Sequence, residues 1–392
     1  MSASRRRWLV AVAASALLAG LSGPVTAQAG VPGRMVVADP ASGQERALSA
    51  VSAISRSDAW AVGRSDGPDG SSTALILRWD GASWTTVHHF DSGPDSILNG
   101  VSADSARDAW AVGLYCAAQC AGAPVDEALI VHWNGSAWTR VPTPDPSSTF
   151  NVLYDVSADS PTDAWAVGLF QGPVATKTFV LHWDGASWSR VNSPDPGSSF
   201  NQIDGVAAIS PADVWVSGFS LNFGAPRLKG LLLHWNGSRW SPKPREAAAA
   251  DAVTSISARN VWAVGSTGSG PQPRTLGLHW NGSSWSRTPT PDPGPGFNEF
   301  YSVGAASGTD VWAVGSDCAA KCGRFGEVDE ALIGHWDGAK WSRIRCPDPN
   351  PRDNELLGVT AVSSHDAWAV GFAGTHGLIL HWNGSTWSQA SL

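Results

Sequence analysis

Two stretches of the chain carry cysteines and carboxylates in the same order, and they are the strongest local signal for chemistry. Cys116 and Cys120 have three residues between them, as do Cys318 and Cys322. In a helical turn, residues with this spacing have Cα atoms about 6 Å apart, within reach of a disulfide. For a protein exported to oxidising surroundings we therefore expect two local disulfides, 116–120 and 318–322. The fifth cysteine, Cys346, is left unpaired.

Each cysteine pair is followed by two adjacent acids, Asp126 and Glu127 in the first stretch and Asp329 and Glu330 in the second. The cross-linked loops could serve rigidity alone, or they could present these carboxylates to a ligand. A metal site is the third explanation, but neither loop contains a histidine. We therefore expect no metal and no cofactor.

Two tyrosines, Tyr154 and Tyr301, occupy equivalent positions in different repeats of the chain. Both fall on the expected innermost strand of their repeat, where they could line the mouth of a central channel. No catalytic residue is assigned, because the sequence shows no Ser-His-Asp, zinc or phosphate-loop motif. The candidate ligand-binding residues are Tyr115, Asp126, Glu127, Tyr154, Tyr301, Arg324, Asp329 and Glu330.

A repeated scaffold must position these side chains, and repetition is the dominant feature of the sequence. A phrase like Asp-Ala-Trp-Ala-Val-Gly occurs seven times, and a second phrase, His-Trp-Asn/Asp-Gly-x-x-Trp, follows each copy of it. The first phrase supplies Trp60, Trp110, Trp165, Trp215, Trp262, Trp312 and Trp368. The second supplies the pairs Trp79/Trp84, Trp133/Trp138, Trp183/Trp188, Trp235/Trp240, Trp280/Trp285, Trp336/Trp341 and Trp382/Trp387.

Each unit is typical of four short antiparallel strands. The Asn-Gly and Asp-Gly dipeptides of the second phrase favour two-residue hairpin turns, and no segment shows a helical period of apolar residues. A four-stranded unit of about 50 residues is the size of a propeller blade. Radial stacking gives both faces of each sheet a neighbour. The sequence therefore predicts an all-β, seven-bladed β-propeller with four antiparallel strands per blade.

The repeated polar residues favour structural roles. The tryptophans could stack on sugars, but a residue required in every unit is what a repeating core demands. The outer tryptophans beside the hairpin, Trp84 and its equivalents, are expected to be the more exposed class. The repeated histidine is expected to hydrogen-bond the neighbouring turn backbone. The aspartate that opens the first phrase, which is Asn260 in the fifth unit, is expected to cap the preceding turn. Four linkers share Pro-Asp-Pro, which a rigid turn explains.

The expected domain limits follow from the repeat. Residues 1–29 are expected to be a signal peptide, residues 30–47 a lead-in or closing strand, and residues 48–392 the propeller. The expected blades span about 48–96, 97–150, 151–200, 201–248, 249–298, 299–354 and 355–392.

The two phrases resemble known propeller repeats. The Trp-Ala-Val-Gly strand followed by a Gly-x-x-Trp turn is similar to the photosystem II assembly factor family. Asp80, Gly81 and Trp84 also resemble the Asp-box of sialidases, although Asn replaces Asp in four units. The phrase His-Trp-Asn-Gly-Ser-Ser-Trp-Ser is similar to repeats of bacterial propeller lectins and of secreted actinobacterial proteins. These resemblances imply the fold far more than a function.

The N-terminus and the charge limit the location and the partners. Arg5, Arg6 and Arg7 precede an apolar run with small-residue cleavage sites at Ala27 and Ala29, which is typical of a Sec or Tat signal peptide. Removal of residues 1–29 leaves 23 basic and 34 acidic residues, a net charge of −11. This charge argues against nucleic acid as a partner. We expect a secreted monomer with no membrane span.

All strong motifs of the chain are architectural, which favours a binding protein over an enzyme. The long linkers and the loops between second and third strands should share one end of the ring, and variable length at one end indicates a binding face. We expect a glycan, cell-wall or protein ligand there or between blades. The alternative is a sialidase-like glycoside hydrolase or lyase that uses loop carboxylates, which needs two of them at a set separation.

Overall fold

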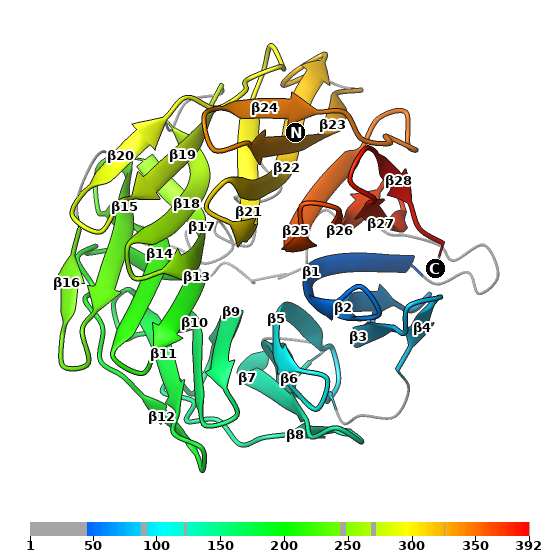
Figure 1. Cartoon of the computed structure of the whole chain (residues 1–392). Coiled ribbons are helices and arrows are strands. Elements are labelled where there is room, and N and C mark those ends of the chain that lie inside the picture. Colours follow the sequence, from blue (N-terminus) through cyan, green and yellow to red (C-terminus); the bar gives the residue numbers. More distant parts are fainter. Residues whose placement is uncertain are drawn as a thin grey trace.

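Seven antiparallel sheets of four consecutive strands stand around a common axis (Figure 1). This computed structural model describes residues 45–87, 92–120, 124–243, 248–267, 272–324 and 326–391. It confirms the all-β, seven-bladed propeller, and no helix occurs in the described ranges. The expected signal peptide, residues 1–29, and most of the expected lead-in lie outside the described residues. The first strand begins at Glu45, inside the segment expected as a lead-in.

The strands occupy four positions from the axis outward, and each blade contributes one strand to each position. The innermost strands are β1 (Glu45–Ser55), β5 (Ile97–Ser105), β9 (Asn151–Ser160), β13 (Phe200–Ser210), β17 (Ala248–Ser257), β21 (Asn298–Ser307) and β25 (Asn354–Ser363). The second strands are β2 (Asp58–Asp66), β6 (Asp108–Ala118), β10 (Asp163–Gln171), β14 (Asp213–Asn222), β18 (Asn260–Thr267), β22 (Asp310–Ala320) and β26 (Asp366–Ala373).

The outer half of each blade is shorter. The third strands are β3 (Ser72–Trp79), β7 (Val125–Trp133), β11 (Thr176–Trp183), β15 (Ala225–Trp235), β19 (Arg274–Trp280), β23 (Val328–Trp336) and β27 (His376–Trp382). The outermost strands are β4 (Trp84–Thr86), β8 (Trp138–Arg140), β12 (Trp188–Arg190), β16 (Trp240–Pro242), β20 (Trp285–Thr288), β24 (Trp341–Ile344) and β28 (Trp387–Gln389). Blade 1 comprises β1–β4, and the remaining blades follow in chain order to blade 7, β25–β28.

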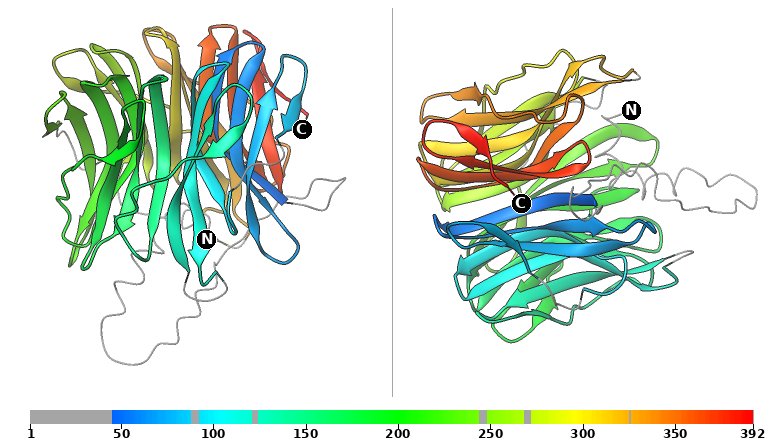
Figure 2. Two further views of the ribbon diagram at one scale, coloured as in Figure 1. Left: turned by 90° about the horizontal axis from the view of Figure 1, so that it is seen from below. Right: turned by 90° about the vertical axis from the view of Figure 1, so that its right-hand side faces the viewer.

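The antiparallel order gives the ring two different ends (Figure 2). The short-turn end holds the turns between first and second strands and between third and fourth strands. The long-loop end holds the loops between second and third strands and the linkers between blades. At the short-turn end, Asn134 Oδ1 accepts bonds from the backbone N–H groups of Ser136 and Ala137, and Gly135 takes a φ of 90°. The hairpin differs from the expected two-residue turn, because four residues, 134–137, separate the register partners Trp133 and Trp138, and of the dipeptide only Gly135 has a positive φ. The Asn/Asp-Gly pair is explained by the side-chain cap and by this glycine.

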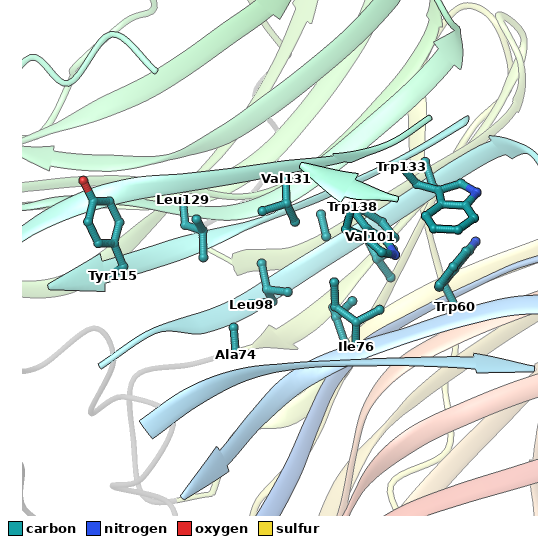
Figure 3. Close-up of a cluster of buried hydrophobic side chains, with 13 residues drawn as sticks. Trp60, Ala74, Ile76, Leu98, Val101, Tyr115, Leu129, Val131, Trp133 and Trp138 are labelled. Atoms are coloured by element: carbon teal, nitrogen blue, oxygen red, sulfur yellow. The ribbon is translucent and has the colours of Figure 1, made fainter. Parts of the chain in front are cut away.

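The blades are held together by one aromatic contact that occurs seven times. Each second-strand tryptophan is at most 1% exposed. It meets the two tryptophans of the neighbouring blade's second phrase, one edge-on with interplanar angles of 82–89° and one tilted at 51–57°. Figure 3 shows this contact between blades 1 and 2, where Trp60 faces Trp133 and Trp138. Edge-on aromatic pairs add about 0.5–1.5 kcal/mol to the burial of their area.

The outermost tryptophans correct an expectation from the sequence. Trp138 is 4% exposed and Trp84 is 6% exposed, and four of the five other equivalents are buried as well. They are buried because each inserts its ring edge against the neighbouring second-strand indole. The third-strand tryptophans are the more exposed class, and Trp79, Trp183 and Trp382 are half-buried.

The repeated histidine and aspartate also differ from expectation, because they bind each other. The imidazole of His182 stacks on Trp165 at 4.4 Å, and its Nε2 lies 2.6 Å from Asp163 Oδ1. The same arrangement occurs in blades 2, 4, 6 and 7, and Asn260 replaces the aspartate in blade 5. In blade 1, Arg78 lies 4.8 Å above Trp60 and bonds Asp58. The turn is capped instead by the serine that ends each first strand.

The ring closes by the same contact that joins its other blades. Trp368 of blade 7 packs on Trp79 and Trp84 of blade 1, at centroid distances of 4.9 and 5.2 Å. All seven sheets consist of strands consecutive in the chain, so the described strands exchange none between the two ends of the sequence. Arg56 and Asp366 add an ion pair of 3.7 Å at this boundary. The described residues form no helix long and apolar enough to cross a membrane.

The tryptophan contact predicts a graded response to truncation. Trp215→Ala removes a fully buried indole between two blades, so we expect a loss of about 3–5 kcal/mol in the free energy of unfolding. Trp235→Ala, at a half-buried third-strand position, should lose less than half as much. Urea unfolding followed by circular dichroism measures both. Equal losses would contradict the proposed order of burial.

Blade 5 predicts a pH effect, because His279 contacts an amide oxygen of Asn260 rather than a carboxylate. Burial lowers the pKa of His279 below its ordinary 6.5. The unfolded chain then binds a proton near pH 6.5 that the folded chain rejects, so the free energy of unfolding falls as the pH drops through this value. Asn260→Asp should reduce that loss between pH 7.5 and 5.5, measured by urea unfolding. Asp213→Asn in blade 4 should increase it, and identical pH slopes in all three proteins would contradict this role.

Candidate binding site at the long-loop end

The two cysteine loops lie at the long-loop end and are hydrogen-bonded to the linkers there. The backbone N–H of Cys116 donates to the carbonyl oxygen of Pro94, and that of Cys318 donates to Phe297. On the far side of each loop, the N–H of Asp329 donates to the carbonyl oxygen of Arg352. Asp126 makes the equivalent bond in blade 2. Each loop is therefore fixed between the linkers before and after its blade.

Both expected disulfides are present, with Cα–Cα distances of 5.7 and 5.8 Å. The local structure differs from the helical turn that was expected. Cys116 and Cys318 lie near the ends of β6 and β22, and the chain then reverses through Gln119 and Lys321. These two residues have φ angles of 58° and 55°. Both values lie in the left-handed region, which a helical turn does not contain.

Tyr115 and Glu127 meet across blade 2. They are register partners on β6 and β7, and the Tyr115 hydroxyl donates to Glu127 Oε2. The Arg140 guanidinium lies 3.7 Å above the tyrosine ring. Burial, followed by the bond to Glu127, raises the pKa of Tyr115. In Figure 3, Tyr115 lies at the opposite end of the blade 1–blade 2 core from the tryptophan contact.

The surface beside this group is shallowly hollowed. Glu127, Arg140, Pro142, Thr143 and Asp145 are among the residues that line the hollow. Both an acid and a guanidinium are therefore available there to a polar ligand.

Asp126 points away from Glu127, because successive residues of a strand face opposite sides. It is the register partner of Cys116. Burial, and then the nearby negative charge of Asp95, raise the pKa of Asp126 to about 6. This carboxylate therefore takes up a proton in mildly acidic solution.

Blade 6 repeats the arrangement with different side chains. Glu330 accepts a 3.1 Å bond from Arg343, whose guanidinium also lies 3.5 Å from Asp317. Asp317 occupies the place of Tyr115 and is 1% exposed. Burial raises its pKa to about 6, although the positive charge of Arg343 opposes the shift.

Asp329 belongs to a second group of acids, which joins blade 6 to the linker before blade 7 and to β25. One carboxylate oxygen from each of Asp329, Asp353 and Glu355 lies within 4.8 Å of the other two, which is close enough for shared coordination of a cation. All three residues are at most 7% exposed. Cys318 also approaches Asp329 and Glu327, but its sulfur is in the disulfide and is not a thiolate ligand.

The remaining candidates lie at separate places. Arg324 is exposed at the tip of the second loop. Tyr154 and Tyr301 both occupy the bulge that interrupts the innermost strand of their blades, which places them on equivalent parts of β9 and β21. The Tyr301 hydroxyl bonds Ser316 at 3.0 Å. Tyr154 packs on an apolar cluster, and burial and the charge of Asp204 raise its pKa.

The two cysteine loops do not form one site. They belong to blades 2 and 6, and blades 7 and 1 separate them on the shorter path around the ring. The structure brings Tyr115 together with Glu127, and it keeps both apart from Asp329, Glu330 and Arg324. The long-loop end therefore carries two separate candidate binding sites of similar layout, which we call stations: one in blade 2 and one in blade 6.

Sequence reasoning missed the role of the linkers. In Pro-Asp-Pro, the aspartate accepts the backbone N–H that the short outermost strand leaves without a partner. Asp145 Oδ1 bonds Ala128 N at 2.9 Å, and Asp348 Oδ1 bonds Ala331 N at 2.8 Å. A buried asparagine such as Asn151 then holds the rest of the linker. The signal was the asparagine that follows each Pro-Asp-Pro at a fixed distance.

Cys346 fits this linker pattern. It precedes Pro-Asp-Pro where the other linkers have Thr143, Ser193 and Thr290, and its sulfur points to the Ala331 carbonyl oxygen, as Thr143 Oγ1 does to that of Ala128. Burial raises the pKa of its thiol. A buried thiol with a raised pKa is a poor nucleophile.

This position predicts that the Cys346 thiol does not react with thiol reagents in the folded protein. A disulfide reagent that reports free thiols should detect almost none in the native protein and one per chain in denaturant. Cys346→Thr should change the free energy of unfolding by less than about 1 kcal/mol, because the same site accepts Thr in two other blades. Rapid reaction of the native thiol would contradict this assignment.

Comparison with known proteins establishes the fold. No protein-family model matches the chain, and no curated protein matches its sequence. Among solved structures it is similar to YCF48 bound to a D1 peptide, with 14% identity, a TM-score of 0.50, and coverage of 86% of this chain and 94% of that one. It is also similar to the GH74 xyloglucanase from Xanthomonas campestris, at 13% identity and a TM-score of 0.55, covering 88% of this chain and 54% of that one.

A polysaccharide lyase of family PL25, an ulvan lyase, gives a TM-score of 0.53 at 10% identity, with 89% of this chain and 96% of that one covered. At these identities the likeness extends to the fold alone. The chain is a propeller repeat protein, and its structural neighbours include both binding proteins and enzymes.

Proposed function

We propose that this chain is an exported, non-enzymatic binding propeller that holds a glycan, cell-wall or surface-protein ligand at its long-loop end. The observation that carries the proposal is where sevenfold symmetry fails. The tryptophans of every blade are occupied by packing, and so are the histidine and aspartate of blades 2, 3, 4, 6 and 7. The departures from the repeat are the stapled loops of blades 2 and 6 and the tyrosines of β9 and β21.

The stapled loops suit binding because their polar groups are already held in place. Tyr115, Glu127 and Arg140 form one fixed group, and Asp317, Glu330 and Arg343 form another. Groups fixed before binding lose little conformational freedom when a ligand arrives. The disulfides, each bonded to a neighbouring linker, add to this rigidity.

The alternative, a glycoside hydrolase or lyase, is favoured by one observation, the three close carboxylates of Asp329, Asp353 and Glu355. Hydrolysis requires two carboxyl groups on either side of a sugar bond, about 5–9.5 Å apart. Here the three oxygens lie within 4.8 Å of one another and are buried. Because all three carboxylates are at most 7% exposed, a polysaccharide cannot reach them in this conformation, which supports binding over catalysis.

Binding and turnover can be separated directly. The full chain, prepared with its disulfides intact, should bind at least one component of a panel of glycans, cell-wall fractions and surface proteins, with saturation measured by calorimetry. Tyr115→Phe tests the site in blade 2, and Glu330→Gln tests the site in blade 6. At least one of these variants should weaken the binding by about tenfold or more.

Two controls complete the experiment. Asp184→Asn, at the short-turn end, removes one charge at a position where four other blades have asparagine, and it should leave affinity unchanged. Release of reducing ends or unsaturated sugars from the same panel, lost in Glu355→Gln, would contradict a non-enzymatic role.

A further inference from the structure

The outermost strand of each blade has only three or four residues, so it covers just part of the outer edge of the third strand. In blade 2 the linker that follows the blade covers the rest. Asp145 Oδ1 accepts the backbone N–H of Ala128 at 2.9 Å, and Thr143 Oγ1 donates to the Ala128 carbonyl oxygen at 3.3 Å. Further along, Asn151 Nδ2 donates to the Asp126 carbonyl oxygen. The linker thus closes an edge that could otherwise pair with another chain.

The bond to the third-strand N–H recurs at the same register place in other blades. In blades 3, 5 and 6 a linker aspartate accepts it at 2.7–2.8 Å, and the pairs are Asp195–Thr178, Asp292–Thr275 and Asp348–Ala331. In blade 1 the acceptor is Ser96 Oγ, 3.0 Å from the nitrogen of Ala74. The linker after blade 4 contains residues 244–247, which lie outside the described ranges. A side-chain acceptor from the following linker is therefore a general part of the ring.

Blade 7 departs from this pattern within the described residues. Gly377 holds the register place of Ala128, because each lies five residues before the tryptophan that ends its third strand. The N–H of Ala390 donates to the Ile379 carbonyl oxygen, and the described cover of β27 stops there. The N–H of Gly377 meets no linker acceptor in the described part of the chain. The outer edge of β27 is therefore open at the long-loop end.

The segment before β1 carries the sequence of the missing cover. Each linker caps the blade before it and leads into the next, and the ring places blade 1 after blade 7. Residues 38–40 are Ala-Asp-Pro, where the other linkers have Pro-Asp-Pro. Asp39 stands seven residues before Arg46, and Asp145 stands six residues before Asn151, which has the register place of Arg46. The segment is therefore long enough to place an aspartate as blade 2 does.

The position of β1 and the side chain beside the open edge favour the same segment. β1 begins with Glu45 at the long-loop end and packs against β25, β26 and β27 (Figure 1). The first described residue thus lies at the end of the ring where the edge is open, on the strand that faces blade 7. His376, which is exposed, precedes Gly377 as Lys177 precedes its capped residue in blade 3. The Lys177 Nζ lies 3.5 Å from Asp195 Oδ2, so a basic side chain at this place suits a linker aspartate.

We propose that residues 38–44 cross from the outer edge of β27 to β1, and that the Asp39 carboxylate accepts the backbone N–H of Gly377. The segment then acts as the seventh linker of the ring. It supplies a side-chain cap and adds no strand to blade 7. The expected cleavage after Ala27 or Ala29 leaves it in the mature chain. The inference concerns how the ring is completed, and it holds whatever ligand the ring binds.

Hydrogen exchange on the full chain, followed by mass spectrometry, tests the proposal. A peptide spanning residues 374–380 reports on Gly377. Asp39→Ala should speed the exchange of one amide in this peptide by about tenfold, because that amide loses its acceptor. Asp39→Asn keeps a side-chain oxygen at the same place and should retain most of the protection. Equal exchange in the parent chain and in Asp39→Ala would overturn the proposal.

Asp145→Ala is the matched control. It removes the cap of blade 2, so it should speed the exchange of Ala128 in a peptide spanning residues 125–131 and leave Gly377 unchanged. Asp39→Ala should leave Ala128 unchanged in turn. Melting curves confirm that both variants are folded. If Asp39→Ala speeds exchange equally in both peptides, the effect is a general loss of stability and the placement is wrong.

Protein concentration separates this linker from a second copy of the chain. A cover supplied by the same chain does not depend on concentration, so the protection of Gly377 should stay constant over about a hundredfold range. Protection that grows with concentration would assign the edge to a second copy and overturn the proposal. Deletion of residues 30–42 should reproduce the exchange of Asp39→Ala, and unchanged exchange after this deletion would contradict the proposed role of the segment.

Discussion

The structure depends on one contact, the insertion of a second-strand indole between the two indoles of the next blade. A four-stranded sheet of this size cannot bury both of its faces by itself. The contact gives each blade a neighbour on both sides, and its seventh occurrence, at Trp368, joins blade 7 to blade 1. On its other face the same indole stacks on a histidine, and this histidine is held by an aspartate, as His381 and Asp366 show.

That contact divides the molecule into a part that repeats and a part that varies. Apart from the Pro-Asp-Pro linkers that four boundaries share, the repeated residues lie from the middle of each blade to the short-turn end, where aromatic packing and capped hairpins leave little freedom. Differences accumulate at the long-loop end. Blades 2 and 6 have disulfides, and blades 3 and 4 have exposed apolar tips. Binding is therefore expected where the scaffold does not determine the side chain.

Much of the fold could be predicted from the sequence, because the repeated residues show both which positions are buried and how far apart the strands lie in the chain. The blade number and the places of the hairpins followed from it, although the turns have four residues rather than the expected two. Both disulfides followed from the spacing of the cysteines. The roles of single residues did not follow, because a repeat shows that a residue is required without showing its partner. The sequence predicts that Asp163 caps a turn, whereas the structure shows that it binds His182. Trp138 flanks a turn, yet its ring inserts into the next boundary. Val174 and Phe223 escaped notice because their exposure depends on loop conformation.

The most direct test of the account is native-state hydrogen exchange across the blade boundaries. If one contact joins all blades alike, backbone amides of β1, β2, β26 and β27 should exchange as slowly as those at the interior boundaries. Opening of the whole ring, rather than of one boundary, should then control exchange in the second strands. Selective fast exchange in blades 1 and 7 would contradict this, because it would show that the boundary between these two blades is weaker than the interior boundaries.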